Sequence, residues 1–331
     1  MLINPIEDIL LNQYKAIYMV ELKIVFLGTS AAIPTYERGL SSIAIARGDE
    51  IIIFDAGEGM QIKFIRSKLG INKKMKIFIT HIHGDHCLGL LGLLQTLSLM
   101  GRTKPIEIFG ESRLQEFILI NQKILNFNVN YQITIHAIQK EGILVEEKEY
   151  LIKACLADHS ILAFSFILEE NKRPGTFNIE YAQQVGIPEG KLYRLLQQGF
   201  DIEYKGTKFF AKEFTGPSRQ GRKIGISGDT RPSKKLELFF KGCDVLVFES
   251  TFTTQEKNKA IERFHSTASE ASSLAKIAKV KKLILTHFSS RYTNLKLIEI
   301  EAKINFANIQ IAHDLDVFPV PYPEKGLTQP N

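Results

Sequence analysis

The chain has 331 residues, 44% of them hydrophobic and 24% charged, an ordinary globular composition whose net charge of +6 suggests a polyanionic partner. No apolar run reaches the roughly 20 residues of a membrane-spanning helix, and residues 1–18 lack the basic start and apolar core of a signal peptide. The scattered Cys87, Cys155 and Cys243 exclude a disulfide framework and indicate a reducing, cytoplasmic location.

Short apolar runs predict buried strands along the chain. These runs are residues 23–27, 51–54, 76–79, 223–227, 245–248 and 282–285. All but the first lead into an ionisable or metal-binding residue, namely Asp55, His81, Asp229, Glu249 and His287. Because α/β proteins build their sites in the loops beyond strand ends, we expect these side chains to converge.

Two helical patterns lie between the predicted strands. Residues 88–100 are apolar almost all round and predict a buried helix, with Gly89 and Gly92 allowing close approach to the sheet. The second helix is expected from about residue 268 to 280, after a capping box formed by Thr267 and Glu270. Its predicted apolar stripe consists of Leu274, Ile277 and Ala278.

A segment from about residue 169 to 223 interrupts the run of strands. It is rich in charge and turn residues, as in 171–175 and 186–190, and predicts an insertion that projects from the core. Its last part mixes cations with Phe209, Phe210 and Phe214, which suits a surface that follows a nucleic-acid backbone. A solvated hairpin, in a surface subdomain without a binding role, is an equally good interpretation.

Four potential metal ligands occur within six residues, directly after a predicted strand. They are His81, His83, Asp85 and His86, and Gly84 allows a tight loop to point them in different directions. One tetrahedral ion cannot easily use all four. We therefore expect two adjacent ions, with the first two residues on one and the last two on the other. Cys87 follows directly but is not needed as a ligand.

The His-x-His-x-Asp-His pattern resembles the metal motif of the metallo-β-lactamase fold, an αββα four-layer sandwich of dinuclear hydrolases. Further matches lie in Asp-Ala-Gly-Glu-Gly, Ala-Asp-His-Ser, Gly-Asp-Thr and Thr-His-Phe. The resemblance implies that Asp55 orients the site without binding metal, and that Asp229 bridges two Zn²⁺ ions, or Mn²⁺ in their place. One ion would bind His81, His83, His159 and Asp229; the other would bind Asp85, His86, Asp229 and His287.

Three other features resemble tRNase Z, the endonuclease that trims the 3′ ends of precursor tRNA. They are Gly28–Pro34, the pair Glu249 and His265 in Phe-Glu-Ser-Thr and His-Ser-Thr, and a flexible arm that grips tRNA. The resemblance runs from about Val20 to about Val320. The arm residues it implies are Gly186, Pro188, Gly190, Lys191 and Arg194. Lys191 stands where a proline is common, and Phe-Glu-Ser-Thr replaces the frequent His-Glu-Ala-Thr.

The resemblance also implies a mechanism and a partner. Asp85 would accept the proton of the attacking water, His265 would protonate the leaving 3′ oxygen, and Glu249 would orient His265. The products would be tRNA with a 3′ hydroxyl and a trailer with a 5′ phosphate. The family usually forms homodimers, in which the arm of one subunit presents precursor tRNA to the active site of the other.

These features predict a catalytic domain at residues 19–320 with an inserted tRNA-binding arm at about 169–205. Residues 1–18 would be an N-terminal extension and 321–331 a tail. A related hydrolase of small phosphodiesters, thioesters or lactams would share the ligands but lack the arm and the His265–Glu249 pair. A non-catalytic RNA-binding module would not need seven ligands, and His83 argues against an oxygen- or nitric-oxide-reducing relative, which typically has Glu there. His136 and His313 match no motif and are expected to be structural or surface residues.

Overall fold

The computed structural model describes residues 20–323, so the predicted extension at residues 1–18 and the tail beyond residue 323 lie outside the described part. Residues 21–169 and 222–323 form one compact unit, and residues 170–221 form another. None of the helices in the described part combines the length and hydropathy that a membrane span requires.

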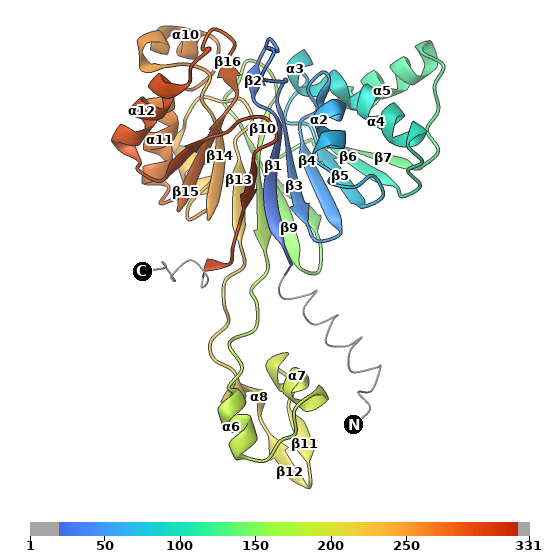
Figure 1. The fold of residues 1–331 in the computed structure, drawn as a ribbon, viewed down its shortest axis with the longest axis vertical. Helices are drawn as coiled ribbons and strands as arrows, with labels where there is room; N and C mark the ends of the chain where they lie inside the picture. The colour runs from blue at the N-terminus through green and yellow to red at the C-terminus, as the bar shows by residue number, and fades with distance from the viewer. Residues whose placement is uncertain (1–19, 324–331) are drawn as a thin grey trace. The chain divides into compact units, whose positions relative to one another are not determined.

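The larger unit contains two seven-stranded sheets that face each other (Figure 1). The first sheet has the order β18-β1-β3-β4-β5-β6-β7. Its strands are Val317–Pro319, Leu22–Gly28, Ser42–Arg47, Glu50–Phe54, Lys74–Phe78, Ile106–Gly110 and Ile133–Ala137. The second has the order β17-β15-β14-β13-β10-β9-β8. Its strands are Ile309–Ile311, Lys282–Thr286, Val245–Glu249, Lys223–Ile226, Phe164–Glu170, Tyr150–Leu156 and Gly142–Glu146.

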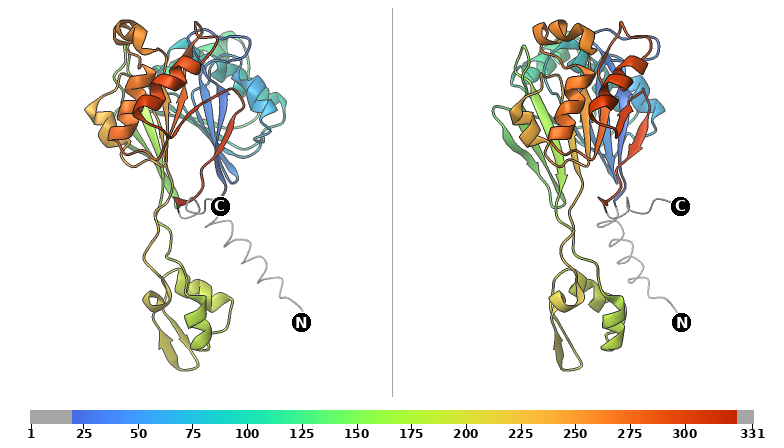
Figure 2. Two further views of the ribbon diagram at one scale, coloured as in Figure 1. Left: turned by 60° about the vertical axis from the view of Figure 1, so that its left-hand side comes forward. Right: turned by 90° about the vertical axis from the view of Figure 1, so that its left-hand side faces the viewer.

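Helices cover the outer face of each sheet, which completes four layers (Figures 1 and 2). The first sheet is covered by α2 (Met60–Arg66), α4 (Gly89–Leu99) and α5 (Arg113–Ile124). The second is covered by α9 (Lys234–Phe239), α11 (Ala268–Ile277) and α12 (Lys296–Asn305). One apolar cluster fills the space between the sheets, and two more lie under the helices. The predicted αββα sandwich is confirmed.

All six predicted strands are present, within two residues of their expected bounds. Strands β4 to β7 are parallel to one another, as are β13, β14, β15 and β17. Their carboxyl ends therefore meet along one edge of each sheet, and the residues that follow them are brought close together. The strands that the apolar runs missed include the edge strands β7, β8, β17 and β18, which are only partly buried.

Both predicted helices are confirmed, with one correction to a buried face. A side chain at Gly89 of α4 would collide with the carbonyl of Gly57, so close approach does depend on this glycine. The capping box of Thr267 and Glu270 is present at α11. Ile277, however, is 60% exposed. Successive residues of a helix are about 100° apart around its axis, which places Ile277 to one side of Leu274. Ala271, Ala275 and Ala278 lie to the other side, and these three are buried together with Leu274.

The smaller unit is built from short elements around its own core. They are α6 (Ile179–Gln184), α7 (Lys191–Gln197), the hairpin of β11 (Ile202–Tyr204) and β12 (Thr207–Phe209), and α8 (Ala211–Phe214). Its core consists of Ala182, Ile187, Leu196, Ile202, Ala211 and Phe214. Two of the glycines singled out in the sequence, Gly186 and Gly190, have positive φ. Gly186 lies just after α6, and Gly190 lies just before α7.

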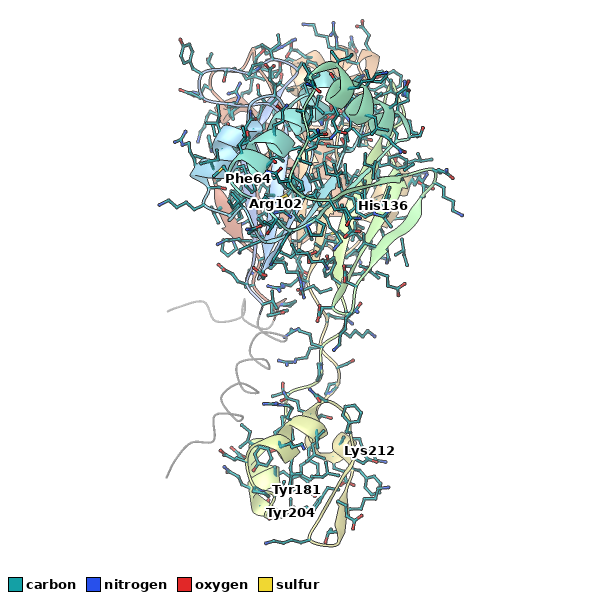
Figure 3. The ribbon with its side chains drawn as sticks, turned by 90° about the vertical axis from the view of Figure 1, so that its right-hand side faces the viewer. Phe64, Arg102, His136, Tyr181, Tyr204 and Lys212 are labelled. Atoms are coloured by element: carbon teal, nitrogen blue, oxygen red, sulfur yellow. The ribbon has the colours of Figure 1, made fainter. Side chains whose placement is uncertain are left out.

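The basic segment with interleaved phenylalanines thus contains a hairpin, and its aromatic rings have different roles. Phe214 is fully buried and Phe209 packs against the same core, so these two are structural. Phe210 is exposed, and the ammonium groups of Lys208 and Lys212 lie over its ring. Lys212, Tyr181 and Tyr204 are labelled on this unit in Figure 3. Only Phe210 of the three is available for an apolar contact with a partner.

Candidate metal and active site

The predicted metal ligands come together beyond the carboxyl ends of the strands. Figure 1 labels two elements of this region, α3 (Gly84–Cys87) and β16 (Phe288–Ser289). His81 follows β5, and the short α3 carries Asp85 and His86. Asp229 follows β13, and His287 follows β15. The chain thus builds the site from both sheets, with most ligands held at the ends of buried strands.

The ligand atoms form two groups. In the first, Nδ1 of His83 lies 3.0 Å from Nε2 of His81 and 3.2 Å from Nε2 of His159. In the second, Nε2 of His86 lies 3.2 Å from Nε2 of His287, and Oδ2 of Asp85 lies 3.6 Å from each of these nitrogens. Within each group all ligand atoms are close enough to share one ion.

Asp229 lies between the two groups and is almost fully buried. Its Oδ2 is 3.2 Å from Nε2 of His86 and 3.8 Å from Nε2 of His81, and its Oδ1 is 3.3 Å from Nε2 of His287. Although burial opposes the charged form, the imidazoles of His287 and His86 hold its pKa well below the ordinary value. A carboxylate in this place can contact both ions, as the resemblance implied.

The chemistry of this donor set fits metal ions. Burial lowers the pKa of His81 and of His83, so both imidazoles are neutral, which is the form that binds metal. Ring nitrogens about 3 Å apart repel one another when their lone pairs face each other. A cation that binds both lone pairs removes this repulsion. Five histidines and two carboxylates are ligands that zinc and manganese accept.

Hydrogen bonds behind the ligands set which nitrogen faces the site. Asp55, which was predicted to orient the site, accepts from the backbone N–H of Thr80 at 2.7 Å and contacts Nδ1 of His86 at 2.7 Å. The hydroxyl of Thr80 contacts Nδ1 of His81 at 2.9 Å. A partner at Nδ1 leaves the Nε2 lone pair of these two histidines free for a metal.

Thr251 has a related role that the sequence analysis did not identify. Its hydroxyl donates to Glu249 at 2.6 Å, so at His287 it must accept from Nδ1, which lies 2.9 Å away. That arrangement again leaves Nε2 of His287 facing the site. The resemblance marked Glu249 in this tetrapeptide, and nothing in the sequence pattern indicated a contact with a histidine 36 residues away.

The structure also brings His265 and Glu249 together, with Nδ1 2.9 Å from Oε1. Glu249 is buried and accepts further hydrogen bonds from the backbone N–H groups of Thr230 and Ser266. Burial disfavours the charged imidazole, but the charge of Glu249 outweighs it and raises the pKa of His265 to about 9. Together, the buried carboxylate and its hydrogen bonds give His265 a fixed orientation and a tendency to carry a proton.

A cavity of about 390 Å³ opens beside these groups. Asp85, Asp229, His83, His265 and His287 line one part of it. Ile33, which belongs to the Gly28–Pro34 motif, lines another part. Phe252, Arg263 and Arg291 also line the cavity, and no sequence motif pointed to these three. Two arginines and an aromatic ring next to the candidate metal ligands suit an anionic substrate with planar groups.

Several residues at the site have backbone conformations that side chains rarely adopt. Ala32, Asp55, Phe264 and His287 all have positive φ, between 56° and 62°. The backbone N–H of Ala32 donates to Oδ2 of Asp85 at 2.8 Å. Strained conformations of this kind persist only where the surrounding structure enforces them, and they gather at functional sites.

Other residues with potential chemistry lie apart from the metal ligands. The thiol of Cys87 is 3.7 Å from the carbonyl of Ile82, and burial raises its pKa to about 11, so it stays protonated. His136 stacks on Phe109 in the first sheet, and His313 is exposed. The predicted arm residues Gly186, Pro188, Gly190, Lys191 and Arg194 belong to the smaller unit.

Comparisons with known proteins identify the family. A ribonuclease Z from Nitrosopumilus maritimus is 55% identical over 271 residues, which cover 82% of this chain and 90% of that protein. The chain belongs to the ribonuclease Z family. A ribonuclease Z from Methanosarcina acetivorans is 40% identical over 303 residues, covering 91% and 99% of the two chains. The family resemblance expected from the sequence motifs is confirmed.

Solved structures agree with membership of the ribonuclease Z family. The crystal structure of the short form of human tRNase Z matches with a TM-score of 0.67 and 27% identity, covering 90% of this chain and 99% of that one. A metallo-β-lactamase fold protein from Bacillus subtilis, YhfI, matches with a TM-score of 0.64 at 16% identity, which supports the fold. A family described as anti-Pycsar protein Apyc1 matches residues 22–150, a part that ends before His159, Asp229 and His287.

Proposed function

We propose that this member of the ribonuclease Z family is an endoribonuclease that removes the 3′ trailer from precursor tRNA. The observation that carries the proposal is the Glu249–His265 pair at 2.9 Å. His265 lines the same cavity as several of the clustered metal ligands. The ligands alone suit many hydrolases of this fold. A protonated histidine beside them suits a reaction whose leaving group is a poor one, such as the 3′ oxygen of a ribose.

In this proposal each residue has a separate task. Metal ions bound at the two ligand groups would supply an activated water and neutralise charge on the scissile phosphate. Asp85 accepts the proton of the attacking water, since His287 and His86 hold its pKa low against the effect of burial and keep it a carboxylate. His265 donates a proton to the leaving 3′ oxygen, and Glu249 keeps its ring in place. The products carry a 3′ hydroxyl and a 5′ phosphate.

We further propose two Zn²⁺ ions per subunit, with Mn²⁺ as the alternative. His81, His83, His159 and Asp229 would hold one, and Asp85, His86, Asp229 and His287 would hold the other. The support is the donor set itself. Three imidazoles form one group, and two imidazoles with Asp85 and Asp229 form the other. Asp229 also lies 3.8 Å from Nε2 of His81 in the first group.

Asp85→Ala is expected to slow trailer removal by at least about a thousandfold, because the variant loses both a ligand and the proton acceptor. The assay is cleavage of a precursor tRNA that carries a 3′ trailer, with the new ends mapped and a parallel reaction in chelator. Asp49→Ala, which changes an exposed carboxylate in the turn between β3 and β4, is the matched control. Cleavage that survives both chelator and Asp85→Ala refutes the proposal.

We propose that residues 170–221 are the arm that binds tRNA, and the core allows a clean deletion to test this. β10 and β13 are antiparallel neighbours in which Glu169 pairs with Lys223, so an Asn-Gly turn can replace residues 171–221. In the same precursor assay, this deletion should reduce cleavage of tRNA at least about a hundredfold, since a second binding surface is lost. Hydrolysis of bis(p-nitrophenyl) phosphate should stay within about twofold. Equal loss of both activities means that the arm has no separate binding role.

We also propose a homodimer formed through an apolar surface on α2 and the turn before α4. Ile62, Ile65 and Leu88 are each between 45% and 60% exposed there. The two helices pack closely, since a side chain at Gly92 of α4 would contact Gln61 of α2. Exchanging Ile62 and Ile65 for glutamate should convert dimers to monomers in sedimentation velocity. Exchanging Leu297 and Ile300 of α12, which are also exposed, is the control and should leave the dimer intact. A dimer that persists in the first variant places the interface elsewhere.

A further inference from the structure

Arg231 lies two residues beyond Asp229 and connects this loop to the segment that carries His265. Its Nη1 lies 2.8 Å from Oε2 of Glu270 and its Nη2 2.5 Å from Oε1, a two-pronged ion pair that is mostly buried. Nη1 also donates to the backbone carbonyl of His265. The mechanism described above gives this arginine no task.

Glu270 makes this connection rigid because it has a second role in the fold. It completes the capping box of α11 by accepting from the backbone N–H and the hydroxyl of Thr267, both at 3.0 Å. Arg231 is therefore fixed to the start of a buried helix. His265 precedes that start by three residues, in the turn between α10 (Lys257–Glu262) and α11.

The same turn is tied to a candidate metal ligand. Nδ1 of His159 lies 3.1 Å from the carbonyl of Phe264, whose φ of 58° is unusual for a bulky residue. The backbone N–H of Arg231 donates to the carbonyl of Asp158 at 2.9 Å. The loops that hold His159, Asp229 and His265 thus meet at the guanidinium and backbone of Arg231.

We propose that Arg231 is a positioning residue for the proton donor His265, an inference that rests on the proposed function. It holds the carbonyl of His265 and so sets where the imidazole lies relative to Asp229 and the bound phosphate. A planar guanidinium can pair with both oxygens of Glu270 and still donate to a third acceptor, whereas the ammonium of lysine cannot reproduce this fork. Arg231→Lys therefore keeps the charge and loses the geometry.

The test uses the fact that leaving groups differ in their need for a proton. A p-nitrophenolate leaves readily without one, whereas a ribose 3′ oxygen needs a well-placed acid. For Arg231→Lys we expect kcat on precursor tRNA to fall about 10- to 100-fold with an unchanged KM, and kcat on bis(p-nitrophenyl) phosphate to fall less than threefold. Bound metal, measured by mass spectrometry, should be unchanged. Equal losses on both substrates, or no loss on tRNA, overturn the proposal.

A double-mutant cycle separates positioning from a merely structural effect. In a His265→Ala background, Arg231→Lys should cause no further loss on precursor tRNA, because the group that it positions is already absent. An undiminished loss in that background overturns the proposal. Glu270→Gln keeps a side chain of the same shape and should show a smaller loss with the same substrate dependence, which provides a second variant if Arg231→Lys folds poorly.

A third substrate keeps this inference distinct from the proposed function. A diribonucleotide has a ribose 3′ leaving group but no tRNA structure. If the unaltered protein hydrolyses it and bis(p-nitrophenyl) phosphate but leaves precursor tRNA intact, the proposed function fails. The comparison of the two small substrates then still decides the role of Arg231. Lys104→Met, which removes an exposed pair with Asp49, is the control and should change neither ratio.

Discussion

Asp229→Ala is expected to remove most of the bound metal and to slow precursor cleavage by at least about a thousandfold. Within residues 20–323, Asp229 is the one carboxylate that lies within 4 Å of candidate ligand atoms from both groups, at 3.8 Å from His81 and 3.2 Å from His86. Without it, buried imidazoles face one another with less negative charge to hold two cations. Metal content by mass spectrometry and single-turnover cleavage measure the two effects.

The matched control for this prediction is Asp316→Ala. Asp316 is a half-exposed carboxylate that accepts a hydrogen bond from the backbone N–H of His313. Neither residue belongs to the candidate site. Its replacement should leave metal content and cleavage within about twofold. An Asp229→Ala protein that retains two metal ions, or loses less than about tenfold in rate, contradicts the assignment of a bridging role.

Lys76→Met is expected to destabilise the protein by about 3–5 kcal/mol, because it leaves the buried carboxylate of Glu50 without its nearest cation, while Lys74 stays 3.7 Å away. Lys76 is 1% exposed, and its ammonium lies 2.9 Å from Glu50 and 2.8 Å from Glu147. These acids come from opposite sheets, so the pair also joins the two layers. The loss would be a large share of the 5–15 kcal/mol that typically stabilises a domain. Urea unfolding at equilibrium measures it.

Position along the chain makes the Lys76 prediction specific. The network lies near the amino ends of β4 and β5, whereas the candidate metal ligands lie beyond the carboxyl ends of the strands. The folded variant should therefore keep its activity per molecule. Lys104→Met, which removes an exposed pair with Asp49, should cost less than about 1 kcal/mol. A similar loss in both variants means that the buried network adds no special stability.

The sequence was most informative where the physics is local. Apolar runs predicted the strands because burial on both faces favours continuous hydrophobic residues. The capping box at Thr267 was readable because it joins residues three positions apart. The His81–His86 cluster was readable for the same reason. Motif resemblance then added His159, Asp229 and His287, which no local pattern connects to that cluster.

The direction in which a side chain faces, and the residues that it contacts, were harder to predict from the sequence. Ile277 is apolar but faces outward, and Phe214 lies in a basic segment but faces a core. Lys76 begins the predicted strand at residues 76–79, yet it is buried, with acidic partners from both sheets. In each case the outcome depends on which surface packs against the residue, and that surface comes from a distant part of the chain.

By itself, the sequence determined the types of element, their order, and a dense set of candidate metal ligands after one strand. The motif resemblance implied a bridging role for Asp229, but only the tertiary structure decided which atoms face one another: Asp229 beside His86 and His81, Thr251 behind His287, and Arg231 behind His265. The physical reason is range. Helix caps and strand patterns act over a few residues, whereas these contacts join loops 34 to 148 positions apart and exist only because parallel strands bring their carboxyl ends to one edge.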